Sequence, residues 1–279
     1  MSSDVVSAMQ AQLLRLLSLL GILLACAGLL RGTLSPGPLP VSPPENNVIA
    51  DGEDLVYEVS WAFVKLGTIR LKTHRDRTSE AYIHSYDGLP FVDLHSVHYT
   101  TLDSCFYSLA SRSLEKKEDE WWGLEYRFDT ARKRLYVEEV FKKDFASPPY
   151  RRDMRDTIQL SSMSFIDGLS IAYFPRAFLH TRQTLTVPTV LYGKLGETTF
   201  TFGGLPTTES IDALPYPVRV IEVPGTTTVQ GIYGMTGNFT GWFSDDAAGV
   251  PIKGKLKVLI GSVTVELIQW NRKGWSPPH

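Results

Sequence analysis

Residues 239–270, FTGWFSDDAAGVPIKGKLKVLIGSVTVELIQW, carry the most regular alternation of apolar and polar residues in this chain of 279 residues. The run from Gly254 to Leu267 predicts a β-hairpin with a two-residue turn at Ile260-Gly261. Gly261 can adopt the positive φ that such a turn requires. In this register the apolar face is made of two facing pairs, Leu256 with Val265 and Val258 with Val263.

The other face of the same hairpin is polar. The register places Lys257 opposite Thr264 and Lys255 opposite Glu266, which gives a charge-matched surface for solvent. Upstream, residues 240–243 predict another strand, which ends at Ser244-Asp245-Asp246. We interpret these aspartates as turn residues rather than paired catalytic carboxylates or calcium ligands, because neighbouring side chains diverge and Asp commonly caps turns.

Alternation continues through most of the chain. In the first strand Leu55, Tyr57, Val59 and Trp61 share one face, and a second run at 67–72 predicts its hairpin partner. A mixed-charge run at 151–156 indicates a solvated edge. Further strands are expected at 81–86, 94–101, 106–112, 120–128, 134–141, 185–191, 198–202, 216–223 and 227–233.

A single helix is predicted at 164–180. Ser164 can cap its N-terminus, Asp167 follows three residues later, and apolar residues recur at helical spacing until Pro175, which should kink or end it. Helices between successive strands are missing from the pattern, which argues against a parallel α/β fold. The sequence therefore predicts a mainly β fold, an antiparallel curved sheet, open barrel or sandwich with one central helix.

The N-terminal residues have a different character. An apolar run from Leu16 to Leu30 has the length of a signal-peptide core and is short for a membrane span. It is compatible with a cleaved secretory signal, a retained membrane anchor, or a lipoprotein signal in which Cys26 is lipidated. We expect an exported protein of the periplasm or the membrane-anchored cell envelope. The expected divisions are a signal or anchor helix at 1–32, a Pro-rich linker at 33–52, one antiparallel β domain at 53–270 and a polar tail at 271–279.

Several functions find no support in the sequence. A net charge of -2 gives no basic face for nucleic acid. His95 and His98 fall on opposite faces of a strand and cannot share one metal ion, and no Gly-x-Ser-x-Gly elbow or phosphate loop occurs. Cys105 would lack a partner once Cys26 is removed or lipidated, so we expect a packed thiol. We predict no catalytic residues, no metal and no cofactor.

The sequence resembles a bacterial family of exported proteins of unknown function, DUF3108. The resemblance extends over about 52–270 and is strongest in its last block. It rests on alternating Glu53, Leu55, Tyr57, Val59 and Trp61 with Gly67, on Tyr126, Phe128 and Asp129, on Asp167, Leu169, Ser170, Tyr173 and Arg176, and on 241–246 with 250–252 and 258–263. Gly249 departs from the basic residue expected there. The family implies an exported β-rich protein and supplies no activity.

The expected layout also resembles, more distantly, the half-barrel of LolA-type lipoprotein carriers, which would imply a concave apolar face, a helical lid and an acyl chain as ligand. We therefore weigh a binder of apolar or lipid-like molecules against a structural or interaction module with an envelope protein partner, and against a hydrolase. The residues expected to face a ligand or form the core are Tyr57, Trp61, Trp242, Leu256, Val258, Val263 and Val265. The sequence leaves open whether they fill a core or line a cavity.

Overall fold

The computed structural model describes residues 49, 51–89, 93–129, 131–160, 164–191, 193–229, 235–258 and 261–279, with 235 and 236 described by their backbone only. The expected signal or anchor helix at 1–32, with Cys26, lies outside these residues, as does most of the 33–52 linker. Within the described part of the chain, no helix is both long and apolar enough to cross a membrane.

The described residues form a mainly β fold built on one antiparallel sheet of 15 strands. Along the sheet the order is β8-β7-β6-β5-β4-β3-β2-β1-β15-β14-β13-β12-β10-β9, with β11 paired to β12. The strands are β1 (Glu53–Trp61), β2 (Val64–Thr73), β3 (Thr78–Ser85), β4 (His95–Leu102), β5 (Ser108–Lys117), β6 (Glu120–Asp129), β7 (Arg134–Lys142), β8 (Arg151–Gln159), β9 (Thr184–Leu191), β10 (Lys194–Thr201), β11 (Thr207–Glu209), β12 (Val218–Thr227), β13 (Met235–Ser244), β14 (Pro251–Val258) and β15 (Ser262–Asn271).

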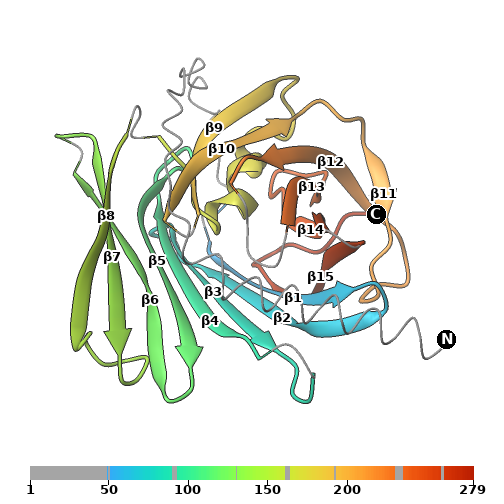
Figure 1. Cartoon of the computed structure of the whole chain (residues 1–279). Coiled ribbons are helices and arrows are strands. Elements are labelled where there is room, and N and C mark those ends of the chain that lie inside the picture. Colours follow the sequence, from blue (N-terminus) through green and yellow to red (C-terminus); the bar gives the residue numbers. More distant parts are fainter. Residues whose placement is uncertain are drawn as a thin grey trace.

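The sheet curls into an open barrel (Figure 1). Strand β9, at one end of the strand order, comes back toward β5, and Gly193 after it packs against β6 and β7, where its N–H donates to the Tyr126 hydroxyl at 2.8 Å. Strand β8 is at the outer edge of the sheet. Residues 164–168 bridge the gap. The backbone N–H of Ser108 donates to Phe165 O at 2.9 Å, and Ile166 forms a parallel bridge with Thr189. The barrel thus closes through a short connecting segment rather than through a continuous strand ladder.

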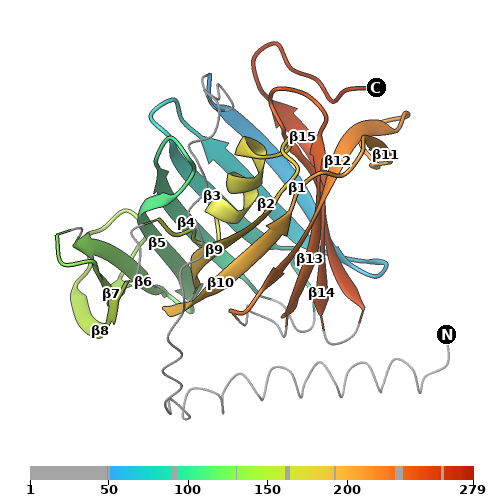
Figure 2. The ribbon, with the colours of Figure 1, turned by 90° about the horizontal axis from the view of Figure 1, so that it is seen from above.

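The predicted helix at 164–180 is correct in place and wrong in type and length. The chain there forms two 3-10 turns, η2 (Ser170–Ala172) and η3 (Phe174–Ala177), which lie inside the barrel (Figure 2). Pro175 lies within η3, where its missing N–H prevents the ladder of a longer α-helix. At the start of these turns Asp167 Oδ1 accepts the N–H groups of Leu169 and Ser170 at 2.9 and 2.8 Å.

The hairpin of β14 and β15 forms, but its predicted register is wrong by two residues. Leu256 faces Val263 rather than Val265, and Lys253 rather than Lys255 faces Glu266. The hairpin closes between Val258 and Gly261, where the Val258 N–H donates to Gly261 O at 3.3 Å. A shift of two keeps every side chain on its predicted face, since strand side chains alternate with period two. The expected strand at 227–233 is also wrong at its start, because Thr227 ends β12; residues 230–234 lie outside the described part.

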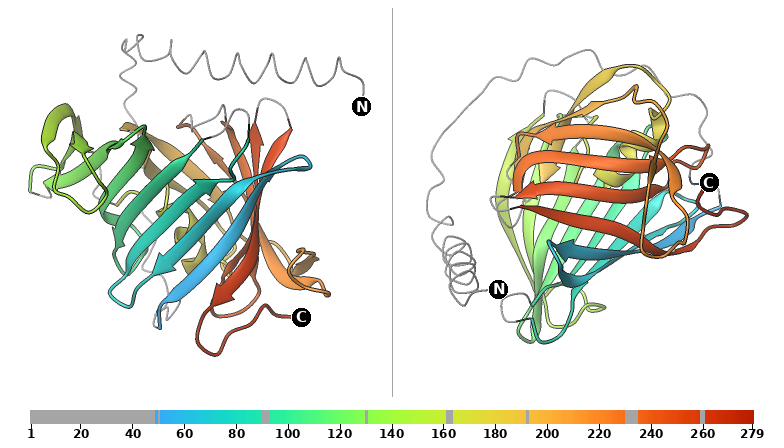
Figure 3. Two further views of the ribbon diagram at one scale, coloured as in Figure 1. Left: turned by 90° about the horizontal axis from the view of Figure 1, so that it is seen from below. Right: turned by 90° about the vertical axis from the view of Figure 1, so that its right-hand side faces the viewer.

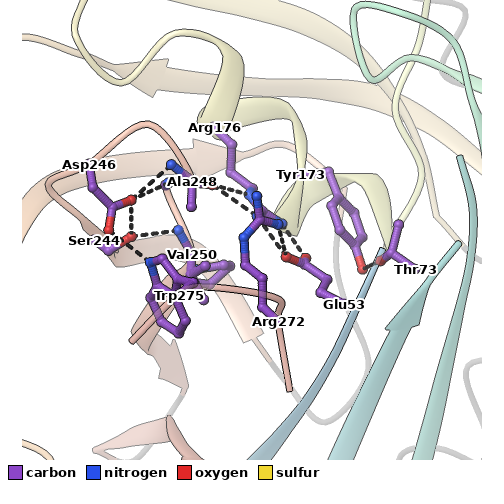
Figure 4. Close-up of polar contacts among 12 residues, drawn as sticks. Glu53, Thr73, Tyr173, Arg176, Ser244, Asp246, Ala248, Val250, Arg272 and Trp275 are labelled. Carbon is purple, nitrogen blue, oxygen red and sulfur yellow. Dashed lines mark hydrogen bonds and ion pairs between the residues drawn. The ribbon is translucent and has the colours of Figure 1, made fainter. Parts of the chain in front are cut away.

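The turns η2 and η3 form a plug, residues 169–178, that fills one end of the barrel. Tyr173, Phe174 and Phe178 are almost completely buried, and Phe174 and Phe178 pack against Phe200 and Phe202 from β10 and the residues after it. Beneath these rings lies a buried ion network (Figure 4). Arg176 binds both carboxyl oxygens of Glu53 and also donates to Ala248 O, and Arg272 binds Glu53 at 2.8 Å. The network ties the plug to β1 and to the C-terminal end of β15.

The Asp246 turn and the last residues complete this end. Asp246 Oδ1 accepts the N–H groups of Ala248 and Gly249, while Oδ2 accepts the Trp275 indole N–H at 2.8 Å. These contacts confirm the interpretation of Asp246 as a turn residue. The segment expected to be a polar tail is docked, because Pro278 O accepts the Arg219 N–H at 2.9 Å. The C-terminus and the β14–β15 turn therefore lie at opposite ends of the barrel (Figure 3).

Candidate functional site: an interior cavity

The barrel interior contains a cavity of about 380 Å³ that is partly open to solvent. This volume falls within the range of about 300–1,000 Å³ typical of small-molecule pockets. Most of the lining is apolar and comes from strands on both sides of the barrel as well as from the helical turns. The principal apolar contributors are Tyr57, Ile69, Leu71, Ala81, Ile83, Leu169, Ile171, Val223, Phe239, Leu256 and Val265.

One glycine at an inward position contributes to this space. Gly254 on β14 lines the cavity opposite Gly241 on β13, whereas the Gly241 position is covered by the ring of Phe243, which an added Cβ would meet at 2.7 Å. A Cβ added at Gly254 would meet only the Cβ of Val265, at 3.9 Å. That separation is ordinary van der Waals contact, so the site can hold a larger side chain without pushing its neighbours aside.

The helical plug forms one wall of the cavity. Leu169, Ile171, Ala172 and Pro175 all line it from the plug. The other face of the same turns makes the closely packed aromatic contacts described above. The cavity therefore lies between the plug and the end of the barrel where β14 turns into β15.

His98 brings a polar group into this apolar interior. It is on the inward face of β4 beside Ala81, and its Nε2 lies 3.2 Å from the hydroxyl of Ser96. Its Nδ1 has no hydrogen-bond partner among the residues that the structure describes. Burial lowers the His98 pKa to about 4, although the charge of Asp167 acts in the opposite direction. The ring keeps part of its accessible surface because it faces the cavity.

Asp167 is another polar residue of the lining. It is only 4% exposed, and its Oδ1 is occupied by the two N–H groups that it caps. Its Oδ2 is buried without a hydrogen-bond partner among the described residues. Hydroxyls of Ser108 and Ser170 accept its backbone N–H at 3.1 and 2.7 Å and fix its position at the start of the plug. Buried polar atoms are rarely left unpaired, so Oδ2 is the least satisfied feature of the site.

The residues predicted to face a ligand divide into two groups. Tyr57, Leu256 and Val265 line the cavity, and Tyr57 is held in place because its hydroxyl donates to Pro251 O at 2.9 Å. The remaining predicted residues are partly buried but are not part of the lining. They are Trp61, Trp242, Val258 and Val263. The indole N–H of Trp242 donates instead to Glu222 at 3.2 Å.

From the sequence, neither His98 nor Asp167 is identified as a lining residue. His95 and His98 are predicted to lie on opposite faces of a strand, and the structure confirms this; His95 Nδ1 lies 2.9 Å from His84 Nδ1. Asp167 is named near the start of the predicted helix and among the residues of the family resemblance, without a ligand-facing role. The sequence signal for His98 is on β4, where Ser96, His98 and Thr100 share one face. That face is polar, although it lies beside the apolar residues Ala81 and Ile83 of β3.

Other candidate chemistry does not gather at one place in the described residues. No three His, Cys, Asp or Glu side chains there lie close enough together to hold a metal ion. Cys105 is a free, partly buried thiol packed against the core, in agreement with the packed thiol expected from its neighbours. The interior cavity is thus the feature on which a function can be argued.

Comparison with known proteins supports the fold. No family model and no curated protein match the chain. Among solved structures, it is similar to the crystal structure of a β-barrel-like protein of domain of unknown function DUF1849 from Brucella abortus. The two share 9% sequence identity at a TM-score of 0.55, over 81% of this chain and 100% of the other. The chain therefore has the fold of a β-barrel-like domain of unknown function, while the resemblance to DUF3108 has no family match behind it.

Proposed function

We propose that this protein is a non-catalytic carrier or receptor that holds an apolar or amphipathic, lipid-like molecule inside its barrel. The observation that carries the proposal is the cavity of about 380 Å³, whose walls are mostly apolar and which has open space at Gly254. An apolar space of this kind gains little from water and can accept an alkyl chain. Transfer of a chain from water contributes about 0.8 kcal/mol for each methylene buried, before the costs of binding are subtracted.

The same proposal places the protein in the cell envelope. The apolar run at 16–30 followed by a Pro-rich stretch supports export, with a cleaved signal, a retained anchor and lipidation at Cys26 as the three alternatives. A lipid-like ligand fits this setting, because amphiphiles are abundant at membranes.

A structural or interaction module is the second candidate, and one observation bears on it. The outer strand β8 leaves one edge unpaired in the described sheet, with Tyr150 and Met154 exposed near it. This edge also carries Arg151, Arg152 and Arg155. Charged side chains on an edge strand oppose pairing with another chain, so the edge supports the interaction function less well than the cavity supports binding.

The test of the proposal is to purify the full chain from its own envelope and analyse it by native mass spectrometry. We expect a bound amphiphile on the wild-type protein and on Lys257→Leu, a control that changes an exposed position on β14. We expect its loss from Gly254→Leu, which puts a side chain into the cavity. A wild-type protein that carries no small molecule, and that also fails to bind the neutral apolar probe N-phenyl-1-naphthylamine, would overturn the proposal.

A further inference from the structure

Two histidines face each other on the outer surface of the sheet. His84 on β3 lies directly opposite His95 on β4, and the neighbouring Ile83 lines the cavity, so both imidazoles are on the outward face. The next pair, Ser85 and Leu94, carries the backbone hydrogen bond at 2.9 Å. The histidines therefore form the kind of antiparallel pair whose side chains come closest. Their Nδ1 atoms are 2.9 Å apart, which brings two metal-binding nitrogens together.

The surroundings of the pair leave these nitrogens able to bind an ion. A neutral imidazole carries its proton on one ring nitrogen and keeps a lone pair on the other. His95 Nε2 lies 3.2 Å from Asp93 Oδ1, so we assign the proton of this ring to Nε2 and the lone pair to Nδ1. In the ion-free protein His84 Nδ1 then donates to His95 Nδ1. Moving the His84 proton to Nε2 makes both Nδ1 atoms available as ligands.

The spacing of the two nitrogens favours one coordination geometry. Metal–imidazole bonds are about 2.0–2.1 Å long, so two ligands at a right angle lie about 2.9 Å apart, and two tetrahedral ligands about 3.3 Å apart. The observed 2.9 Å fits the right angle. Square-planar and tetragonal sites of nitrogen and oxygen ligands suit Cu²⁺, which also has the highest affinity among the divalent ions of its row.

We propose that His84 and His95 form a surface site for a Cu²⁺ ion, bound through both Nδ1 atoms. Rotation of a histidine ring about χ2 is broad, so each exposed or half-buried ring can turn its lone pair toward the shared ion. In the described part of the chain no third His, Cys, Asp or Glu joins the pair, so water takes the remaining positions. Asp93 orients the His95 ring from its far side. The site lies outside the cavity and does not depend on the proposed function.

The experiment is isothermal titration of the untagged full chain with Cu²⁺ at neutral pH, in a buffer that does not bind the ion. We expect saturable binding and an electron paramagnetic resonance spectrum of tetragonal form, with nitrogen coupling from both imidazoles. Wild-type protein that binds no Cu²⁺, or a spectrum that shows oxygen ligands alone, would overturn the inference.

Substitution distinguishes this pair from other surface histidines. Changing a residue that only orients a metal-binding histidine costs about 10–100-fold in affinity, so we expect His84→Gln and His95→Gln each to weaken Cu²⁺ binding by at least about 10-fold. In each variant the nitrogen coupling should fall to that of a single imidazole. His74→Gln is the matched control, because His74 is an exposed histidine beside a carboxylate, 3.6 Å from Glu80 Oε1, and we expect it to bind as wild type does. Equal affinity in wild type and His84→Gln, or a loss as large in His74→Gln, would contradict the inference.

Discussion

Substitution of Gly254 by leucine tests whether the interior space exists in solution. Gly254 faces the cavity between Gly241 and Val265, and an added Cβ would find its nearest neighbour at 3.9 Å. Replacing a strand glycine removes a backbone penalty of about 0.5–1 kcal/mol. Burying a leucine side chain adds about 1.5–3 kcal/mol, from which ordering the side chain subtracts about 0.5–1 kcal/mol. We expect the ligand-free variant to be more stable than wild type by about 2 kcal/mol.

The assay is chemical and thermal unfolding of the delipidated proteins, followed by circular dichroism. For a domain of this size, about 2 kcal/mol corresponds to a rise in Tm of about 4–8 °C. Lys257→Leu is the control for adding leucine to β14 outside the cavity, and we expect it to leave Tm nearly unchanged. A loss of about 1–3 kcal/mol in Gly254→Leu is the result of overpacking a filled core, and it would refute the reasoning.

Three further predictions concern residues around the cavity. Glu53→Gln leaves the guanidinium of Arg176 buried without its carboxylate, so we expect the free energy of unfolding in urea to fall by about 3–5 kcal/mol. A fall of less than about 1 kcal/mol would show that the ion network contributes little to stability. Gly249→Ala places a Cβ on a backbone with φ +54° and 2.7 Å from Leu179 Cδ1, so we expect the free energy of unfolding to fall by about 1–3 kcal/mol in the same assay. Wild-type stability in this variant would contradict the prediction. Burial lowers the pKa of His98 to about 4, against 6.5 in the unfolded chain, and the charge of Asp167 opposes this shift. Because the unfolded chain binds the proton more readily, stability is full above about pH 6.5 and falls by up to about 3 kcal/mol as the pH drops toward 4. His98→Gln should flatten that slope, and an unchanged slope would show that other groups produce it.

The strand pattern of this fold could be predicted from the sequence because it depends on local alternation. Leu55 and Tyr57 on β1 and Ile69 and Leu71 on β2 face inward as their period-two spacing predicts. The hairpin of β14 and β15 kept its predicted faces while its register moved by two residues. Alternation specifies the face of each residue, but registers two residues apart satisfy it equally well, and the turn then decides between them.

The plug and the site required information that is not local. Phe174 and Phe178 have helical spacing, yet Pro175 and the capping carboxyl of Asp167 convert the segment to short 3-10 turns. His98 and Asp167 are far apart in sequence and line the same cavity because residues 164–168 bridge β5 and β9 when the sheet curls. A cavity also depends on which inward positions are left unfilled by neighbouring strands, and the open space at Gly254 could be recognised only once β14 was in register with β15.

The most direct test of the central claim is a crystal structure of the protein soaked with a fatty alcohol that carries bromine at its far end, such as 10-bromodecanol. We expect an anomalous bromine peak inside the barrel, within the cavity lined by Phe239, Leu256 and Val265. A barrel interior filled by protein side chains, or bromine bound only on the outer surface of the sheet, would contradict it.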